Sequence, residues 1–288
     1  MKKYLVIGNP IEHSLSPKLH NHWIKQNNID AVYEKKQLNE NDITAMIDEV
    51  KSEKINGINV TVPFKKSVIP FLDQLTLIAK EAQSVNTIFK KDNKIVGDNT
   101  DIGGFEYGLK HINYNVQNKK VAVIGSQTPW IEAMLINRNN DVTTVEYNVS
   151  TTFFEKLTLV DYFDSFEKSE EEYDCIVTFS SVEHSGLGRY GDPLDPNGDI
   201  KTMKSIHRNL KTNGILIWGA PVGKDALVWN AHRIYGEIRL PLIFENFKEL
   251  EWLGGSKNEL FSLPLTKDPI KQPVIALEKK TTNNYYKM

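Results

Sequence analysis

The chain has 288 residues, of which 40% are hydrophobic and 25% are charged, and its net charge is −2. These values are ordinary for a globular protein, and the length is typical of two domains. A near-neutral charge excludes a strongly basic surface, so we expect neither nucleic acid nor a membrane as a partner. The single cysteine, Cys175, excludes an intrachain disulfide, and no apolar run is long enough for a signal peptide or a membrane span. We therefore expect a cytoplasmic protein.

Strand-like and helix-like segments alternate along the first 112 residues. The hydrophobic patterns predict strands at 4–10, 31–38, 55–62 and 85–100, the last segment as a hairpin around Asp92 and Asn93. They predict helices at 16–29, 40–53, 63–72 and 101–112, with Pro17 and Pro63 at the start of two of them. The polar residues 113–119 are typical of a linker.

A second alternating series begins at Lys120. It predicts strands at 120–125, 141–147, 173–181 and 214–221, and helices at 128–138 and 199–210. Regular alternation of strands and helices favours parallel sheets. We therefore expect an α/β protein with two domains. These are an N-terminal α/β domain at 1–112 and, after the linker at 113–119, a C-terminal Rossmann-like doubly wound parallel sheet at 120–275, followed by a polar tail at 276–288.

Polar side chains follow the strands of the first half, at the sheet edge where open α/β sheets bind ligands. They form three clusters: Ser14 and Ser16; Asn59, Thr61 and Lys65; and Asn99, Thr100 and Asp101. Asn59 and Thr61 are two residues apart, so they share one face of a strand. The same residue types also cap helices or are simply solvated, so the spacing leaves both a ligand site and a structural role open.

The segments that carry these residues resemble the signature segments of shikimate dehydrogenases. They read GNPIEHSLSPKLHN, GINVTVPFK, VNTI and DNTDIGGF, and they occur in the family's order within residues 1–112. The resemblance implies a substrate-binding domain for shikimate or 3-dehydroshikimate, in aromatic amino acid biosynthesis.

The resemblance also implies a role for each matching residue. Ser14 and Ser16 would hold the carboxylate; Asn59, Thr61, Asn86 and Asp101 would hold ring hydroxyls; Lys65 and Asp101 would be the catalytic pair. A lysine held beside a carboxylate can accept the proton that leaves a secondary alcohol when its hydride is transferred.

The loop after the first strand of the second half departs from this family. A dinucleotide site needs Gly-x-Gly-x-x-Gly there, but residues 125–130 read GSQTPW, with Gly125 as the only glycine. Glu146 follows the next strand, where an acidic side chain binds ribose hydroxyls. We therefore name Gly125 and Glu146 as candidate cofactor-binding residues, although Glu146 would repel the 2′-phosphate of NADP.

The second half resembles instead an uncharacterised family with a methyltransferase-like fold. The matching segments are VIGSQTPWIEAML, VTTVEY, SSVEHSGLGRYGDPLDP and PVGKDALVWNAHRIYG, within residues 120–250. In class I methyltransferases an acidic residue at the position of Glu146 binds the ribose of S-adenosylmethionine, so the resemblance implies that role here. The change of resemblance near 119–121 predicts a chimera, natural or constructed.

Three functions remain open from the sequence. We favour a shikimate dehydrogenase-like oxidoreductase that transfers hydride reversibly between shikimate and NADP or NAD. The alternatives are an S-adenosylmethionine-dependent methyltransferase-like protein and a chimera that binds shikimate without catalysis. No spacing of His, Cys, Asp or Glu predicts a metal site, and no feature predicts an oligomeric state.

Overall fold

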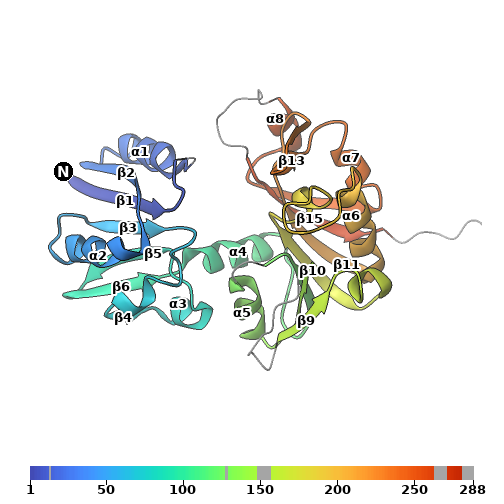
Figure 1. The fold of residues 1–288 in the computed structure, drawn as a ribbon, viewed down its shortest axis with the longest axis horizontal. Helices are drawn as coiled ribbons and strands as arrows, with labels where there is room; N and C mark the ends of the chain where they lie inside the picture. Colours follow the sequence, from blue (N-terminus) through green and yellow to red (C-terminus); the bar gives the residue numbers. More distant parts are fainter. Residues whose placement is uncertain (13, 127–128, 148–156, 263–270, 281–288) are drawn as a thin grey trace, which may run out of the picture. The chain divides into compact units, whose positions relative to one another are not determined.

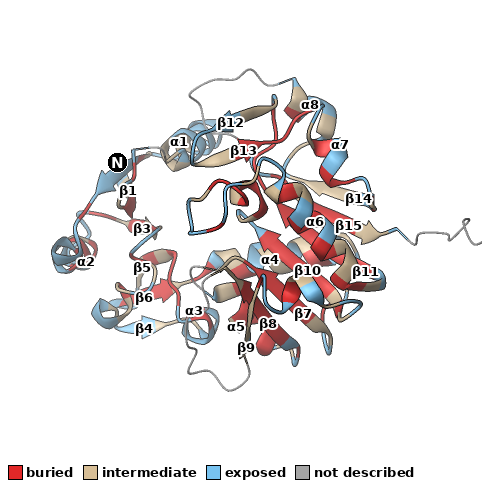
Figure 2. Ribbon diagram, turned by 45° about the vertical axis from the view of Figure 1, so that its right-hand side comes forward, coloured by how far each residue is buried: buried red, intermediate tan, exposed pale blue. Residues whose placement is uncertain are grey.

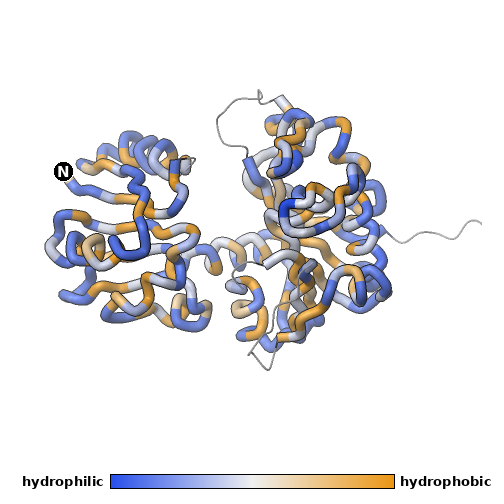
Figure 3. The backbone as a smooth tube through the Cα atoms, viewed as in Figure 1, coloured by the Kyte–Doolittle hydropathy of each residue, from blue (hydrophilic) through white to orange (hydrophobic). Residues whose placement is uncertain are grey.

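The chain divides into two compact units, Met1–Tyr107 and Gly108–Met288. The computed structural model describes residues 1–280 except 13, 127–128, 148–156 and 263–270 (Figure 1). Each unit combines a β-sheet with helices, and hydrophobic stretches occur along the chain of both units (Figure 3). The predicted α/β class with two sheet-rich regions is therefore confirmed. None of the helices in the described part of the chain has the length and hydropathy that crossing a bilayer requires.

The first unit contains a six-stranded sheet in the order β2-β1-β3-β5-β6-β4. Its strands are β1 (Lys2–Gly8), β2 (Ala31–Gln37), β3 (Gly57–Val60), β4 (Gln74–Leu75), β5 (Thr87–Lys91) and β6 (Lys94–Asp98). Its helices are α1 (Ser16–Gln26), α2 (Ile43–Lys51) and α3 (Leu77–Ala82), with 3₁₀ helices η1 (Glu40–Asp42) and η2 (Ile69–Phe71). Helix α4 (Thr100–His111) begins in this unit and ends in the second. Strands β1, β2 and β3 are parallel, whereas β5 runs antiparallel to both β3 and β6.

Helices α1 and α2 cover opposite faces of this sheet because alternate residues of β1 point to opposite sides. Leu5 and Ile7 belong to a core that includes the buried face of α2. Val6 packs instead with Tyr33 of β2 and Ile24 of α1. The polar residues at the strand ends therefore follow strands of a sheet that is packed on both faces.

The second unit contains a seven-stranded sheet in the order β14-β15-β11-β10-β7-β8-β9. Its strands are β7 (Lys120–Ile124), β8 (Asp141–Glu146), β9 (Leu157–Asp161), β10 (Tyr173–Phe179), β11 (Leu210–Gly219), β14 (Phe247–Leu253) and β15 (Val274–Lys279). A separate hairpin is formed by β12 (Ala226–Val228) and β13 (His232–Ile234). The helices are α5 (Trp130–Ile136), α6 (Gly198–Asn209), α7 (Leu240–Ile243) and α8 (Lys257–Phe261), with 3₁₀ helices η3 (Phe166–Lys168) and η4 (Val182–His184).

Five strands of this sheet are parallel and follow the doubly wound order, with β7 and β10 on either side of the switch point. The last strand, β15, lies antiparallel between β11 and β14. An all-parallel dinucleotide-binding sheet would place its sixth strand directly beside the fifth. The predicted parallel sheet is thus extended by an antiparallel pair.

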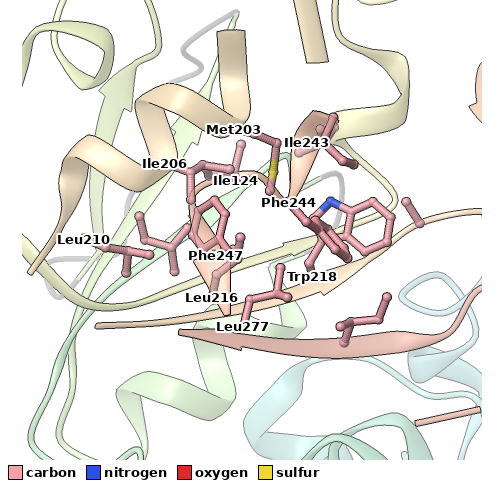
Figure 4. Close-up of a cluster of buried hydrophobic side chains, with 14 of the residues drawn as sticks. Ile124, Met203, Ile206, Leu210, Leu216, Trp218, Ile243, Phe244, Phe247 and Leu277 are labelled. Atoms are coloured by element: carbon pink, nitrogen blue, oxygen red, sulfur yellow. The ribbon is translucent and has the colours of Figure 1, made fainter. Parts of the chain in front are cut away.

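Most residues of β7, β8 and β10 are buried (Figure 2). The core of the second unit surrounds Trp218 of β11, which is fully buried (Figure 4). Its ring makes edge-to-face contacts with Tyr235 and Phe244, at centroid distances of 5.4 and 5.1 Å. Cys175 of β10 is also fully buried, and burial raises the pKa of its thiol to about 12. Cys175 therefore acts as a small buried hydrophobic residue.

The predicted tail at 276–288 begins too early. Residues 276–279 are the last four of the six residues of β15, where Ala276 and Leu277 are buried and paired with β11. The short apolar run from Val274 to Leu277 supplies the strand, and the lysines after it come at the strand's end. Residues 281–288 lie outside the described part of the chain.

Candidate functional site

Lys65 and Asp101, which are 36 residues apart, meet in the first unit. The Nζ atom of Lys65 lies 2.7 Å from Oδ2 of Asp101, and the two side chains are 23% and 32% exposed. This half-buried ion pair keeps a lysine nitrogen and a carboxylate in contact while leaving both open to a small molecule.

The end of α4 that carries Asp101 is fixed by Asn99. The Asn99 side-chain oxygen accepts the amides of Asp101 and Ile102 at 3.0 and 3.3 Å, and its amide nitrogen donates to the Ser84 carbonyl at 3.0 Å. Asn99 is 2% exposed. It is therefore a helix cap, the structural alternative that the sequence left open.

Lys65 does not lie in an α-helix, so the predicted helix at 63–72 is wrong. The segment forms turns, followed by η2. The Lys65 carbonyl accepts the Val85 amide at 2.8 Å, and Pro70 has no N–H to donate to the Lys66 carbonyl four residues earlier. These two features explain why residues 63–72 do not form the helix that their hydrophobic pattern predicts. Phe64, buried beside Lys65, holds the turn against the core.

Asn86 lies next to the Lys65–Asp101 pair and connects β5 to the start of α4. Its Oδ1 accepts the Thr100 amide at 3.0 Å, and its Nδ2 donates to the Thr100 hydroxyl at 2.9 Å. Asn86 is 8% exposed. Its backbone carbonyl also accepts the Asn59 side-chain amide at 3.3 Å, which brings a third candidate residue into the same network.

Asn59 is held by a residue that the sequence analysis missed, Tyr33 of β2. The Tyr33 hydroxyl donates to Oδ1 of Asn59 at 2.6 Å. Burial raises the pKa of Tyr33 to about 12, and the nearby Ser16 hydroxyl opposes that rise. In the sequence Tyr33 is one aromatic residue within a strand pattern, and nothing in that pattern indicates that its hydroxyl makes a hydrogen bond to a candidate site residue.

Ser14, Ser16 and Thr61 complete the candidate set in the first unit, and all three are half-buried. Ser16 is the first residue of α1, and its amide donates to the Ser14 hydroxyl at 3.3 Å. Thr61 follows β3, and its methyl group lies where a Cβ on Gly8 would be only 2.6 Å away. Glycine at position 8 therefore allows Thr61 to approach the end of β1.

The loop after β7 in the second unit begins with a tightly packed glycine, Gly125. Gly125 has φ +74°, and a Cβ there would lie 2.3 Å from the Ser181 hydroxyl, so glycine is required. The backbone amide of Ser126 donates to Oε1 of Glu146 at 2.5 Å. Gln127 and Thr128 of the same loop lie outside the described residues.

A second carboxylate, that of Glu132 in α5, lies close to this loop. Glu132 is 1% exposed and accepts the Thr144 hydroxyl at 2.9 Å. Burial raises the pKa of Glu132, and the Glu146 carboxylate nearby raises it further. Burial also raises the pKa of Glu146, which the Ser126 amide partly offsets. The loop is thus flanked by two acidic groups, and one of its amides is already hydrogen-bonded.

Glu183 lies in η4, just after β10, and its side chain is 1% exposed. Its Oε1 is 3.6 Å from Nε2 of His184, and neither carboxylate oxygen has a hydrogen-bond partner among the residues described. Burial raises the pKa of Glu183 to about 7, although the Ser180 hydroxyl and the Ser181 amide lie near enough to oppose the rise. Burial lowers the pKa of His184.

A cavity of about 390 Å³ lies beside the β12–β13 hairpin, with apolar walls that include Leu194, Leu227 and Trp229. Arg233 and Arg239 also line it, but Arg239 is paired with the buried Asp199 at 2.6 Å. Arg233 donates to backbone carbonyls, so both guanidinium groups already hold the structure together. Among the described residues no group of His, Cys, Asp or Glu could hold a metal ion.

Two family models match the chain, one in each half. The model for the shikimate dehydrogenase substrate binding domain covers residues 6–88. The model described as Caenorhabditis protein of unknown function, DUF268, covers residues 118–282, more than half of the chain. The shikimate dehydrogenase (NADP(+)) of an Exiguobacterium species is 30% identical over 194 residues, 67% of this chain and 72% of that protein. The chain belongs to the shikimate dehydrogenase family in its first half and to the DUF268 family in its second. Both resemblances predicted from the sequence are thereby confirmed.

A shorter match to the shikimate dehydrogenase family has a higher identity. The shikimate dehydrogenase (NADP(+)) of Pelagibacter ubique is 58% identical over 125 residues, 43% of this chain and 47% of that protein. This chain spans only about half the length of the first curated shikimate dehydrogenases that it matches, 47% of one and 42% of the next. The solved shikimate dehydrogenase from Aquifex aeolicus is 28% identical with a TM-score of 0.56, covering 73% of this chain and 85% of that one.

Proposed function

We propose that the chain is a shikimate dehydrogenase-like oxidoreductase whose first unit binds shikimate or 3-dehydroshikimate. The observation that carries this proposal is the 2.7 Å contact between Lys65 and Asp101. Lys65 lies within residues 6–88, which match the family's substrate-binding model, and Asp101 follows that range. The hydroxyls of Ser14 and Ser16 would bind the substrate carboxylate, because neutral donors can hold an anion without a second charge.

The Lys65–Asp101 pair would handle the proton of the reaction. Oxidation of a secondary alcohol removes a hydride from carbon and a proton from oxygen. Lys65, as the neutral amine, would accept that proton and become the ammonium, and Asp101 would hold the lysine nitrogen in place and bind the hydroxyl. In the reverse direction Lys65 would return the proton to the carbonyl oxygen. Thr61, Asn59 and Asn86 would orient the ring through its other hydroxyls.

The curated relatives are named as NADP(+) enzymes, and a nicotinamide dinucleotide, NADP or NAD, would supply the hydride acceptor. The described residues do not fit the phosphorylated form. The Ser126 amide, which would face the pyrophosphate of either form, is taken by Glu146. If a dinucleotide binds through Gly125 and Glu146, the Glu146 side chain can accept from the ribose hydroxyls of NAD but offers no cation to the 2′-phosphate of NADP.

The hydrogen bond that occupies the Ser126 amide favours one second candidate, a protein that binds shikimate without catalysis. Its first unit would keep the substrate residues, while the second unit would not present a nicotinamide. The alternative of an S-adenosylmethionine-dependent methyltransferase gains no support from the relatives found.

Turnover and binding measured on the same preparation separate these candidates. Shikimate oxidation would be followed by the absorbance of reduced nicotinamide, with NADP and with NAD, and shikimate binding by calorimetry. Lys65→Ala should lower turnover about a hundredfold or more, because general acid–base groups contribute that much. The matched control is Lys66→Ala, since Lys66 is adjacent and exposed. Binding without turnover would support the second candidate, and no binding would reject both.

A further inference from the structure

The hydroxyl of Tyr33 lies deep in the first unit, next to two residues of the proposed substrate site. Tyr33 is 4% exposed, and its hydroxyl is 2.6 Å from Oδ1 of Asn59. An amide oxygen can only accept a hydrogen bond, so the direction is fixed: Tyr33 donates. The Ser16 hydroxyl lies near enough to lower the pKa of Tyr33 against the larger effect of burial.

The orientation of the Asn59 amide is completely determined by its neighbours. Its Nδ2 donates to the Asn86 carbonyl at 3.3 Å and to the Thr87 hydroxyl at 3.2 Å. A flipped amide would place its oxygen against the Asn86 carbonyl, which also accepts only. With the nitrogen held on that side, the oxygen must face Tyr33, and the tyrosine is the donor that satisfies it.

The Tyr33 ring is itself supported by α1. It stacks on His20, with ring centroids 4.2 Å apart and planes at 7°, and His20 meets Trp23 edge to face at 5.4 Å. The helix that begins at Ser16 is therefore fixed against the same tyrosine that holds Asn59.

We propose that Tyr33 is a positioning residue of the substrate site, which holds the Asn59 amide directly and, through its stack on His20, the helix that begins at Ser16, at the spacing that a hydroxylated cyclohexene carboxylate requires. This inference rests on the proposed function. Tyr33 connects the residues assigned to the carboxylate end of that ligand with those assigned to a ring hydroxyl. The Asn59 Nδ2 atom donates to the Asn86 carbonyl and the Thr87 hydroxyl, which fixes Asn59 beside Asn86, a second residue assigned to the ring hydroxyls.

Calorimetric titration of the full chain with shikimate tests the proposal. Tyr33→Phe removes only the hydroxyl and should weaken shikimate binding about tenfold, because Asn59 Oδ1 is left as an unsatisfied acceptor. The matched control is Tyr4→Phe. Tyr4 pairs with Tyr33 in the register of β1 and β2, and none of the described residues makes a hydrogen bond to its hydroxyl. This control should bind as the wild type does.

A second variant and a spectroscopic signature separate positioning from general packing. Asn59→Ser should weaken binding by a similar factor, and adding Tyr33→Phe to it should change little, because both act through one hydrogen bond. The side-chain amide resonances of Asn59 should shift in Tyr33→Phe and stay in place in Tyr4→Phe. Wild-type affinity in Tyr33→Phe, or fully additive losses in the double variant, would overturn the inference. A wild-type chain that does not bind shikimate would instead overturn the proposed function.

Discussion

Replacing Glu183 with glutamine should remove a pH-dependent part of the stability of the second unit. In the wild type this carboxyl is 1% exposed, and burial raises its pKa from 4.5 to about 7. The folded protein therefore keeps the proton to a higher pH than the unfolded chain does. The stability that comes from the protonated carboxyl is complete below pH 4.5 and is lost as the pH rises through 7.

The size of the effect follows from the pKa. One pKa unit corresponds to about 1.4 kcal/mol, so the wild type should lose about 3 kcal/mol across this window. Glu183→Gln cannot ionise and should not lose it. The titration of His184 contributes to both proteins, so the difference between them isolates Glu183.

Urea unfolding between about pH 5 and pH 8 measures this difference. The fluorescence of the buried Trp218 follows the second unit, which holds four of the five tryptophans. Glu245→Gln is the matched control, because Glu245 is exposed in the same unit. If wild type and Glu183→Gln show the same dependence of unfolding free energy on pH, the reasoning from burial is refuted.

Three further substitutions test packing and backbone geometry through urea unfolding. Asp199→Asn should cost the second unit about 3–5 kcal/mol, because it leaves the Arg239 guanidinium without its buried partner; a loss below about 1 kcal/mol would contradict this. Gly125→Ala should cost about 2 kcal/mol or more, since the residue has φ +74° and its Cβ would strike Ser181; an unchanged midpoint would show that the loop can move. Asn99→Ala should destabilise the first unit by about 1–2 kcal/mol by removing the cap of α4, and full stability in this variant would reject the cap.

Local chemistry made parts of the fold predictable. Asp92 and Asn93 were expected to form a hairpin turn, and both have positive φ, 48° and 60°, which Asp and Asn tolerate better than most residues. Lys65 and Asp101 each follow a strand, and residues in such positions converge at one edge of a sheet. Their 2.7 Å contact is the result.

Other features depend on contacts between residues that are distant in the sequence. Tyr33 acquires its polar role only because β2 and β3 flank β1, which brings it to Asn59, 26 residues away. Glu146 has the position of a ribose-binding acid, but its carboxylate accepts the Ser126 amide, 20 residues earlier in the chain. Neither partner could be inferred from the periodicity of the strands.

The rate at which the single cysteine reacts with a thiol reagent reports on the opening of the second unit. Cys175 lies in β10 at the centre of the second sheet, fully buried, with a thiol pKa raised to about 12. A thiol reagent reacts with the thiolate, so the folded sheet protects this group both by exclusion and by keeping it protonated. The chain has no other thiol. The rate of labelling in native conditions therefore measures how often the second unit exposes its central strand, whatever the first unit is doing.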